Sequence, residues 1–366
     1  MDAMNYPIID ADAHVIESDD TWDFLEPAEA KYRPKLVDDP DNPGVAYWQV
    51  NGQRGPMALQ VESEDDLESR AQLSKRRTGT PRESRRMQDT QKRVAHMDDL
   101  GIDVQVLHAT MWLLNLTPEP DAEAALARSW NKWLAATTKE SNGRLRWSCL
   151  VPSSMPDEAI SQMRWSKDHG ACAVFLRPME GEKWVTDPAF YPILAEAESL
   201  SLPIAIHIAN ANPANVSMYD NLAAGGQTKA WGIFRVPTVQ SCMFLIMSEI
   251  PKLFPELRWG FIESAAQWMP WVHNESVRRM ETLGLAVPDN VFEASNAYIT
   301  CQSDDDLPWV LKYAGENSLM IGTDYGHSDP SSDIDSINFI RESSELSEDT
   351  KARILYHNPA KLYGLD

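Results

Sequence analysis

Cysteine is scarce in this chain of 366 residues. The four cysteines, Cys149, Cys172, Cys242 and Cys301, lie far apart and form no Cys-x-x-Cys pair. They stand inside apolar runs such as WSCLV and ACAVFL. Thiols with this spacing and these neighbours are typical of buried free cysteines in core strands. We therefore expect neither a disulfide nor a zinc knuckle.

Long hydrophobic runs are also missing. The longest one, residues 242–247, is far shorter than the stretch of about 20 residues that crosses a bilayer. The first residues, MDAMNYPIIDADAHV, lack the basic segment followed by an apolar one that marks a signal peptide. We expect a cytoplasmic protein without a membrane partner.

Basic residues are clearly outnumbered. Lysine and arginine number 33 against 55 aspartates and glutamates, which gives a formal net charge of −22. A field of this sign repels phosphate groups and anionic lipids. Nucleic acid is therefore not expected as a partner, and a small-molecule substrate is.

Several common catalytic motifs are absent. The sequence has no GxSxG, no GxGxxG after a strand, no GxxxxGK[ST] and no HExxH. These motifs mark serine hydrolases, dinucleotide-binding domains, P-loop nucleotide-binding proteins and one class of zinc protease. None of these functions has support in the sequence.

The sequence does contain a regular alternation of short apolar runs and helix-like stretches. Eight apolar runs have few polar interruptions, as expected for parallel strands buried on both faces: residues 6–10, 102–109, 146–151, 172–177, 203–209, 257–263, 297–301 and 318–324. Helix patterns occupy residues 122–141, 156–169, 187–200, 236–250, 265–283, 304–314 and 334–343. This alternation predicts an α/β fold in a single domain over residues 1–366, a closed (β/α)8 TIM barrel, with an open doubly wound sheet as the alternative.

Residues 37–95 interrupt this pattern between the first and second strands. A hairpin is expected around Asn51-Gly52, and a mixed charge run follows at residues 62–86. We interpret the segment as an insertion. It either forms a lid over the barrel mouth or a subunit contact, or it is only a solvated excursion. We expect a homodimer.

Polar residues stand where the apolar runs end. In a barrel these ends meet at one mouth. The residues are the DADAH segment, Arg177, His207, Glu263 and Asp324, with His327 three positions after Asp324. One histidine at a strand end is typical of ordinary hydrogen bonding, but imidazoles and carboxylates converging from several strands match the ligands of zinc, manganese or iron. The joint placement predicts a metal centre.

Four segments carry a resemblance to a known family: IIDADAHVIE, IAIHIAN, MIGTDYGHSD and ILYHNPAKLYGL. They resemble the amidohydrolase superfamily, in particular the amidohydrolase-related branch that contains aminocarboxymuconate-semialdehyde decarboxylase and aromatic-acid decarboxylases. The resemblance implies a distorted (β/α)8 barrel. It also implies one divalent metal ion held by Asp12, His14, His207 and Asp324, with Asp324 in addition orienting or deprotonating a water molecule on the metal.

The sequence departs from that family in two places. Arg177 ends the fourth strand, where many superfamily members have a bridging lysine or glutamate, and this favours a single metal ion. Glu263 stands where the branch usually has a histidine, so it either changes the acid–base step or adds a metal ligand. An oxygen-rich donor set suits manganese or iron at least as well as zinc.

His327 leaves two interpretations open. It is either a hydrogen-bonding partner of Asp324 that shares in catalysis, or a further ligand that would allow two iron ions.

The substrate can be predicted in outline. The chain has 13 tryptophans, and Trp112 and Trp231 lie in connections after strands, where they would form pocket walls for an aromatic or bulky apolar substrate. Arg177 would bind a substrate carboxylate, or alternatively pair with Glu263 or another buried acid.

These observations support one leading hypothesis on function. It is a metal-dependent enzyme that hydrolyses or decarboxylates, without oxidation, an aromatic or unsaturated carboxylate. Asp324 serves as base, and Glu263 or His327 handles the second proton. The alternatives are a non-haem iron oxygenase, with one iron or two, and a barrel that binds a ligand without catalysis.

Overall fold

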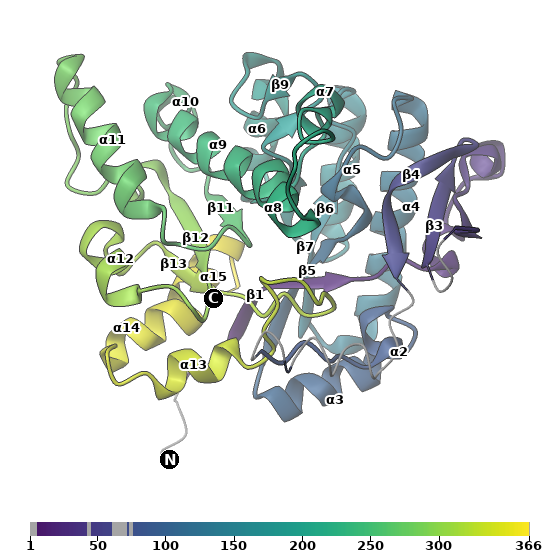
Figure 1. Cartoon of the computed structure of the whole chain (residues 1–366), viewed down its shortest axis with the longest axis horizontal. Helices are drawn as coiled ribbons and strands as arrows, with labels where there is room; N and C mark the ends of the chain where they lie inside the picture. The colour runs from purple at the N-terminus through teal and green to yellow at the C-terminus, as the bar shows by residue number, and fades with distance from the viewer. Residues whose placement is uncertain (1–5, 42–44, 61–71, 73–75, 366) are drawn as a thin grey trace.

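The computed structural model describes residues 6–41, 45–60, 72 and 76–365, and an eight-stranded parallel sheet forms its centre (Figure 1). The strand order is β1-β5-β6-β7-β10-β11-β12-β13. Each of the eight apolar runs predicted from the sequence contributes one strand. The strands are β1 Ile9–Val15, β5 Val104–Ala109, β6 Leu145–Leu150, β7 Ala171–Leu176, β10 Ile204–His207, β11 Trp259–Ile262, β12 Ala297–Cys301 and β13 Leu319–Ile321.

The sheet closes into a TIM barrel between its first and last strands. Ala13 forms an isolated parallel bridge with Tyr325, just beyond the end of β13. The His14 amide donates to the Tyr325 carbonyl at 2.7 Å, and the Asp324 amide donates to the Asp12 carbonyl at 2.9 Å. The closed barrel is therefore confirmed, and its seam brings Asp12 beside Asp324.

Helices surround the strands and cover their outer face (Figure 1). Seven of them agree with the predicted patterns: α4 Pro120–Thr138, α5 Pro156–Asp168, α6 Tyr191–Ser199, α9 Val236–Met247, α11 Met269–Thr282, α12 Leu307–Ala314 and α13 Ser336–Glu342. The others are α2 Arg82–Arg85, α3 Thr90–Leu100, α7 Pro213–Ser217, α8 Gly226–Ala230, α10 Ile250–Leu253, α14 Glu348–Ala352 and α15 Asn358–Tyr363. Short 3-10 helices are η1 Asp19–Trp22, η2 Pro27–Tyr32, η3 Met111–Leu113, η4 Lys139–Ser141, η5 Pro188–Phe190 and η7 Glu293–Ser295, and two π-helices are η6 Trp231–Arg235 and η8 Arg353–His357.

The C-terminal helix α15 supplies part of the core inside the barrel. Ala360, Leu362 and Tyr363 join inward-facing strand residues such as Ile9 and Ile262 in one buried cluster. The Tyr363 hydroxyl donates to the Ala11 carbonyl at 2.8 Å. The closing sequence motif therefore packs inside the barrel and contacts β1. A second, larger cluster of buried residues fills the space between the strands and the helices.

The insertion begins with a three-stranded antiparallel sheet, which Figure 1 shows beside the barrel. Its strands are β2 Lys35–Asp38, β3 Val45–Val50 and β4 Gln53–Gln60. The predicted hairpin at Asn51-Gly52 is confirmed, with φ of 51° and 74° at the two turn residues. Of the charge run at residues 62–86, residues 62–71 and 73–75 lie outside the described residues, and its last part contains α2. The helix α3, which precedes β5, begins at Thr90, inside the stretch assigned to the insertion, and buries Met97 and Leu100 in the main core.

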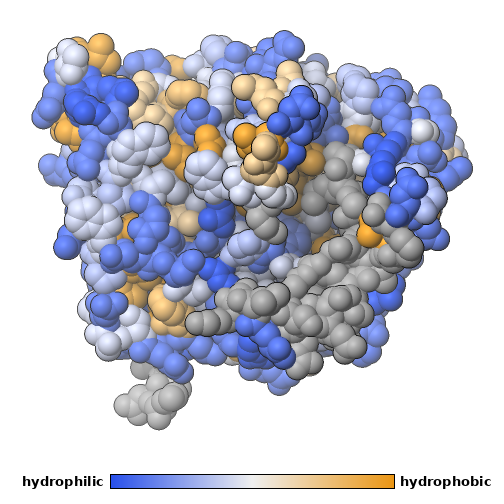
Figure 2. Space-filling view, viewed as in Figure 1, coloured by the Kyte–Doolittle hydropathy of each residue, from blue (hydrophilic) through white to orange (hydrophobic). Residues whose placement is uncertain are grey.

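The cysteines are buried and free, as predicted. One described stretch, Thr228–Met247, has the length and composition of a membrane span, with a mean hydropathy of 1.2. Its C-terminal part is α9, whose Cys242 and Leu245 pack into the core, while Phe244 is exposed. Core helices of soluble proteins share this composition. Around this helix, apolar residues interrupt a largely hydrophilic surface (Figure 2).

Candidate metal centre

Asp12 and His14 come from the middle and end of β1. Residues two apart on a strand point to the same face, so both side chains enter the barrel mouth. The sequence predicted that this strand ends at residue 10, which is wrong, because β1 continues to Val15. Aspartate and alanine are poor strand formers, but neighbours on both sides of β1 supply backbone hydrogen bonds and override that preference.

The other candidate ligands lie at the end of β10 and just after the ends of β11 and β13. His207 is the last residue of β10, and its partner in the register is Ile262, the residue before Glu263. Glu263 and Asp324 have φ of 62° and 50°, in the left-handed region that non-glycine residues seldom adopt. Such backbone is held only where the surroundings enforce it and is frequent at functional sites.

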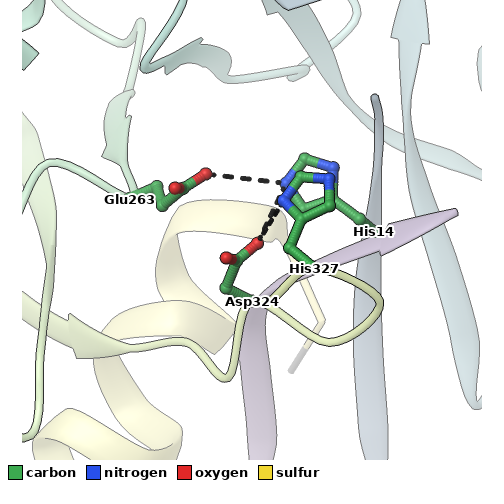
Figure 3. A group of neighbouring side chains, drawn as sticks. All are labelled: His14, Glu263, Asp324 and His327. Carbon is green, nitrogen blue, oxygen red and sulfur yellow. Dashed lines mark ion pairs between the residues drawn. The ribbon is translucent and has the colours of Figure 1, made fainter. Parts of the chain in front are cut away.

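These residues converge on one small volume, and Figure 3 shows three of them, His14, Glu263 and Asp324, together with His327. The Nε2 atoms of His14 and His207 are 2.9 Å apart. Asp12 Oδ1 lies 3.6 Å from the first and 3.5 Å from the second. Glu263 Oε2 lies 3.8 Å and 3.5 Å from the same two atoms, and Asp324 Oδ1 lies 3.5 Å from His14 Nε2. None of the five side chains is more than 3% exposed.

The hydrogen bonds of the two imidazoles show which nitrogens carry hydrogen. His207 Nδ1 lies 3.3 Å from the Ile208 carbonyl, which can only accept, so Nδ1 holds the proton. The Thr110 hydroxyl donates to the Val15 carbonyl at 2.8 Å and can therefore only accept from His14 Nδ1, 3.5 Å away. Both Nε2 atoms then present lone pairs to the centre, which is the state required of a metal ligand.

The carboxylates add to the need for a cation at this point. Asp12 Oδ1 and Glu263 Oε2 are buried and have no hydrogen-bond partner among the described residues, and the buried Asp324 Oδ1 contacts His327 Nδ1 at 2.8 Å. Burial raises the pKa of Glu263 well above its usual value, and the charges of Asp324, Asp329 and Asp12 raise it further. Burial likewise raises the pKa of Asp324 to about 7. Buried acceptors without donors are costly, and a bound cation satisfies all of them together. The donor set therefore fits a divalent metal ion.

His327 lies beside Asp324 and contacts the centre from one side. Its Nδ1 is 2.8 Å from Asp324 Oδ1, and its ring stacks on His14 with centroids 3.9 Å apart. The Thr110 hydroxyl is 2.9 Å from Nε2 and, because its own hydrogen goes to the Val15 carbonyl, accepts from this nitrogen. Burial opposes the charged imidazole, but Asp324 outweighs it and the pKa of His327 rises to about 9. The sequence left open whether His327 is a hydrogen-bonding partner of Asp324 or a further metal ligand. This geometry favours the first interpretation.

Hydroxyl groups that the sequence did not single out hold the carboxylates in place. Ser332 donates to Asp324 Oδ2 at 2.6 Å, and the Glu263 amide donates to Thr300 Oγ1 at 2.6 Å. Asp10 accepts from the amide and hydroxyl of Thr323 at 2.9 and 2.6 Å, which ties β1 to the residue before Asp324. Serine and threonine are too common in loops for a sequence pattern to reveal such roles. Asp10 was visible only as part of the DADAH segment.

Arg177 does not have the position expected of a substrate anchor. Its guanidinium donates to both oxygens of Glu180 and to Glu123 at 3.0 Å. Of the two readings of Arg177, the ion pair is the one observed, although the acids are Glu180 and Glu123 rather than Glu263. Two carboxylates already neutralise this arginine, and the three residues line a cavity of about 490 Å³ together with Ser153 and Phe190.

The two predicted pocket tryptophans differ strongly in exposure. Trp112, in η3, is 2% exposed and belongs to the main core, where its ring lies 6.3 Å from that of Trp22. Trp231, the first residue of η6, is 60% exposed. Position after a strand was the only basis for both expectations. The connections after strands are long enough here for one ring to turn into the core and the other toward solvent.

The fold and the donor set define a TIM-barrel enzyme with a metal centre at the carboxyl ends of its strands. Comparison with known proteins adds the family: the Amidohydro_2 profile of amidohydrolases matches residues 9–365, and the chain belongs to this family. It is accordingly a metal-dependent enzyme of the hydrolase or carboxy-lyase type, and the resemblance found in the sequence is confirmed.

Individual relatives are distant in sequence. The chain is 20% identical over 285 residues to 2-amino-3-carboxymuconate-6-semialdehyde decarboxylase of Dictyostelium discoideum, covering 76% of this chain and 77% of that protein. A solved amidohydrolase of Mycobacterium avium subsp. paratuberculosis K-10 has a TM-score of 0.81 at 17% identity and covers 100% and 99% of the two chains. A dihydroxybenzoic acid decarboxylase of Polaromonas sp. JS666, with bound manganese and the inhibitor 2-nitroresorcinol, has a TM-score of 0.61 at 19% identity over 83% and 94%.

Proposed function

We propose that this enzyme removes a carboxylate, without oxidation, from a small aromatic or unsaturated acid, and that it uses one divalent metal ion. The observation that carries the proposal is the pair of imidazole Nε2 atoms, 2.9 Å apart, that lie beside the carboxylates of Asp12 and Glu263, each of which has a buried oxygen without a donor. The relatives named as decarboxylases support the reaction type.

Asp12, His14, His207, Glu263 and Asp324 would hold the ion. Ligand atoms about 2.0–2.2 Å from one ion lie roughly 3.0–3.6 Å from their neighbours. The distances between the donor atoms, from 2.9 to 3.8 Å, match one coordination sphere. Three oxygen and two nitrogen donors suit manganese, and the relative with bound manganese supports the same choice. When bound, a divalent ion supplies Lewis acidity toward a substrate oxygen.

A single coordination sphere also argues against the alternative function, an iron oxygenase with two metal ions. Two-metal sites need ions about 3.5–4 Å apart, each with its own ligands. The donors here share one centre, and His327 Nδ1 is directed at Asp324 Oδ1 rather than at a second position.

Decarboxylation requires one proton at the carbon that loses carbon dioxide. His327 Nε2 carries a hydrogen, which it donates to the Thr110 hydroxyl. His327 Nδ1 lies 2.8 Å from Asp324 Oδ1, and two atoms that both carry lone pairs attract each other at this distance only when a proton lies between them. Asp324 and His327 thus hold one proton next to the metal ligands. We assign its transfer to the substrate carbon to this pair, with Glu263 completing the ligand set. His327 is 10% exposed and can take up the next proton from solvent.

The test combines metal analysis with product analysis. Protein stripped by a chelator and reloaded with manganese, zinc or iron is incubated with 2,6-dihydroxybenzoate and related hydroxybenzoates, and carbon dioxide and the phenol are quantified. We expect one ion per chain and equal amounts of both products. The variant His207→Ala should lose metal and turnover, whereas His169→Ala, an exposed histidine at the end of α5, should keep both.

Two results would contradict the proposal. Wild-type protein that binds no divalent ion would overturn the metal centre. Metal-dependent cleavage of esters or amides, with no carbon dioxide from any acid tested, would replace decarboxylation by hydrolysis. The homodimer and the cytoplasmic location stay predictions, to be checked by light scattering and by fractionation.

A further inference from the structure

Glu17 is a buried carboxylate that takes no part in the ligand set or in the proton transfer described above. It is 1% exposed, follows β1 by two residues, and pairs with no cationic side chain among the described residues. Its Oε1 accepts from the Thr110 amide at 3.1 Å and from the Trp130 indole at 3.0 Å, and its Oε2 accepts from the Met111 amide at 3.2 Å. Hydrogen bonds to a buried carboxylate are strong, so Glu17 fixes these three N–H groups.

The segment that Glu17 fixes begins where β5 ends. Val15 and Ala109 are register partners at the ends of β1 and β5, and Glu17 and Thr110 lie just beyond this pair. Thr110 is 5% exposed and precedes η3, whose first residue is Met111. The two backbone amides contact Glu17, and the Thr110 hydroxyl contacts histidines of the metal centre. Glu17 therefore sets the position of the backbone that carries this hydroxyl.

The Thr110 hydroxyl makes every hydrogen bond that a hydroxyl can make. It donates to the Val15 carbonyl at 2.8 Å, so it can only accept from its two other partners. These are His327 Nε2 at 2.9 Å and His14 Nδ1 at 3.5 Å. A hydroxyl has one hydrogen and two lone pairs, and here all three are used. Among the described residues, neither N–H group has another acceptor.

One oxygen atom thus sets the hydrogen positions of both histidines. In a neutral imidazole, the hydrogen-bond partner decides which nitrogen carries the hydrogen. With its Nδ1 hydrogen on Thr110, His14 presents the Nε2 lone pair to the other ligands. With its Nε2 hydrogen on Thr110, His327 turns Nδ1 toward Asp324, 2.8 Å away. The two rings stack with centroids 3.9 Å apart, but stacking does not distinguish the nitrogen edges of a ring from its carbon edges.

We propose that Glu17 and Thr110 are positioning residues of this enzyme: Glu17 fixes Thr110, and the Thr110 hydroxyl aligns the metal ligand His14 with the proton carrier His327. The proposal rests on the function proposed above and adds to it two residues outside the ligand set. Loss of a hydrogen-bonding partner of this kind changes metal affinity or activity by about 10- to 100-fold.

The first measurement needs no variant. Full-length protein with isotope-labelled histidine is loaded with zinc, which is diamagnetic, and its imidazole N–H signals are recorded by nuclear magnetic resonance and assigned through their contacts with Thr110. We expect a hydrogen on Nδ1 of His14 and on Nε2 of His327. Both should exchange slowly with water, because both lie in buried hydrogen bonds. A wild type whose His327 carries no hydrogen on Nε2 would overturn the proposal.

The second measurement removes the hydroxyl and keeps the shape of the side chain. In Thr110→Val both N–H groups lose their acceptor, so their exchange with water should become fast. For the hydroxybenzoate that is turned over fastest, kcat should fall by about 10- to 100-fold, with KM changed by less than about twofold. Thr110→Ser keeps the oxygen and should recover the slow exchange and most of the turnover. Thr138→Val is the matched control, because the buried Thr138 hydroxyl donates only to the Leu134 carbonyl within α4.

Glu17→Gln tests the other half of the pair. The carboxamide has the shape of the carboxylate, but its nitrogen cannot accept, so at least one of the three N–H groups loses its acceptor. We expect kcat to fall by about tenfold at unchanged manganese content. If Thr110→Val does not fold, this variant and the wild-type signals decide. Slow exchange and normal kcat in both variants would overturn the proposal, and so would equal losses in Thr110→Val and Thr110→Ser, which would assign the effect to packing.

The two proposals fail separately. If no acid yields carbon dioxide while the imidazole N–H groups respond to the Thr110 variants as expected, the positioning role stands and the reaction is wrong. If wild type releases carbon dioxide and Thr110→Val keeps both slow exchange and turnover, the reaction stands without these positioning residues.

Discussion

The Nε2 atoms of His14 and His207 lie 2.9 Å apart although 193 residues separate them in the chain. Each imidazole binds its own hydrogen-bond acceptor through Nδ1, so both lone pairs face the same point. Three carboxylates reach that point as well. The interior of the barrel mouth is therefore built around a positive charge, and the predictions below follow from this.

Glu263 is expected to act as a metal ligand. Glu263→Gln keeps the shape of the side chain and removes its charge, so we expect manganese affinity to fall by about 10- to 100-fold, in line with the loss of one charged ligand interaction. Competition with a fluorescent chelator measures this. Glu256→Gln, at an exposed position, is the control and should bind manganese normally. Full manganese affinity with lost turnover would instead make Glu263 a residue that only handles protons.

Gly322 is expected to be required for the closeness of β13 to β1. A Cβ at this position would lie 2.3 Å from Asp12 Cβ and 3.1 Å from the Asp12 backbone. Gly322→Ala should therefore lower the free energy of unfolding by about 1–3 kcal/mol and weaken metal binding, because Asp12 has to move. Thermal unfolding and metal analysis report the two effects. Gly225→Ala, which has open space around the added Cβ, should change neither. A Gly322→Ala variant with normal metal affinity would contradict the assigned position of Asp12.

Stability of the metal-free protein is expected to fall as pH rises. Burial raises the pKa of Asp324 to about 7 and that of Glu263 well above its usual value, whereas unfolded carboxyls ionise near about 4. Between these values the folded state binds more protons than the unfolded state, so raising the pH favours unfolding. Asp10 and Glu17, with pKa values of about 6 and 7, act in the same direction.

Bound manganese should abolish the part of this loss of stability at high pH that comes from Asp324 and Glu263, because the ion favours the charged forms of both carboxyls. Melting temperatures at pH 5 and pH 8, with chelator and with manganese, measure the difference. The increase in melting temperature caused by manganese should be larger at pH 8. An equal increase at both pH values would show that these two carboxyls do not meet the ion.

Much of the candidate centre was predictable because its signals are local. Continuous apolar runs marked all eight barrel strands, and polar residues directly after them marked Asp12, His14, His207, Glu263 and Asp324. Strand ends of a parallel barrel share one mouth, so position in the sequence alone implied proximity. The ion-pair partner of Arg177 was not predictable, because whether Arg177 contacts Glu180 or a substrate depends on how the loop after β7 folds.

The sequence by itself determined the order of strands and helices, the free cysteines, the acidic charge and the residue types available to a metal ion. These follow from composition and from hydrophobic patterns within a few residues. Only the tertiary structure decided that β1 runs on to Val15, that Trp112 enters the core while Trp231 faces solvent, and that the Thr110 hydroxyl contacts both His14 and His327. Those outcomes depend on contacts between segments distant in the chain, whose relative positions are set by barrel closure and packing rather than by local propensity.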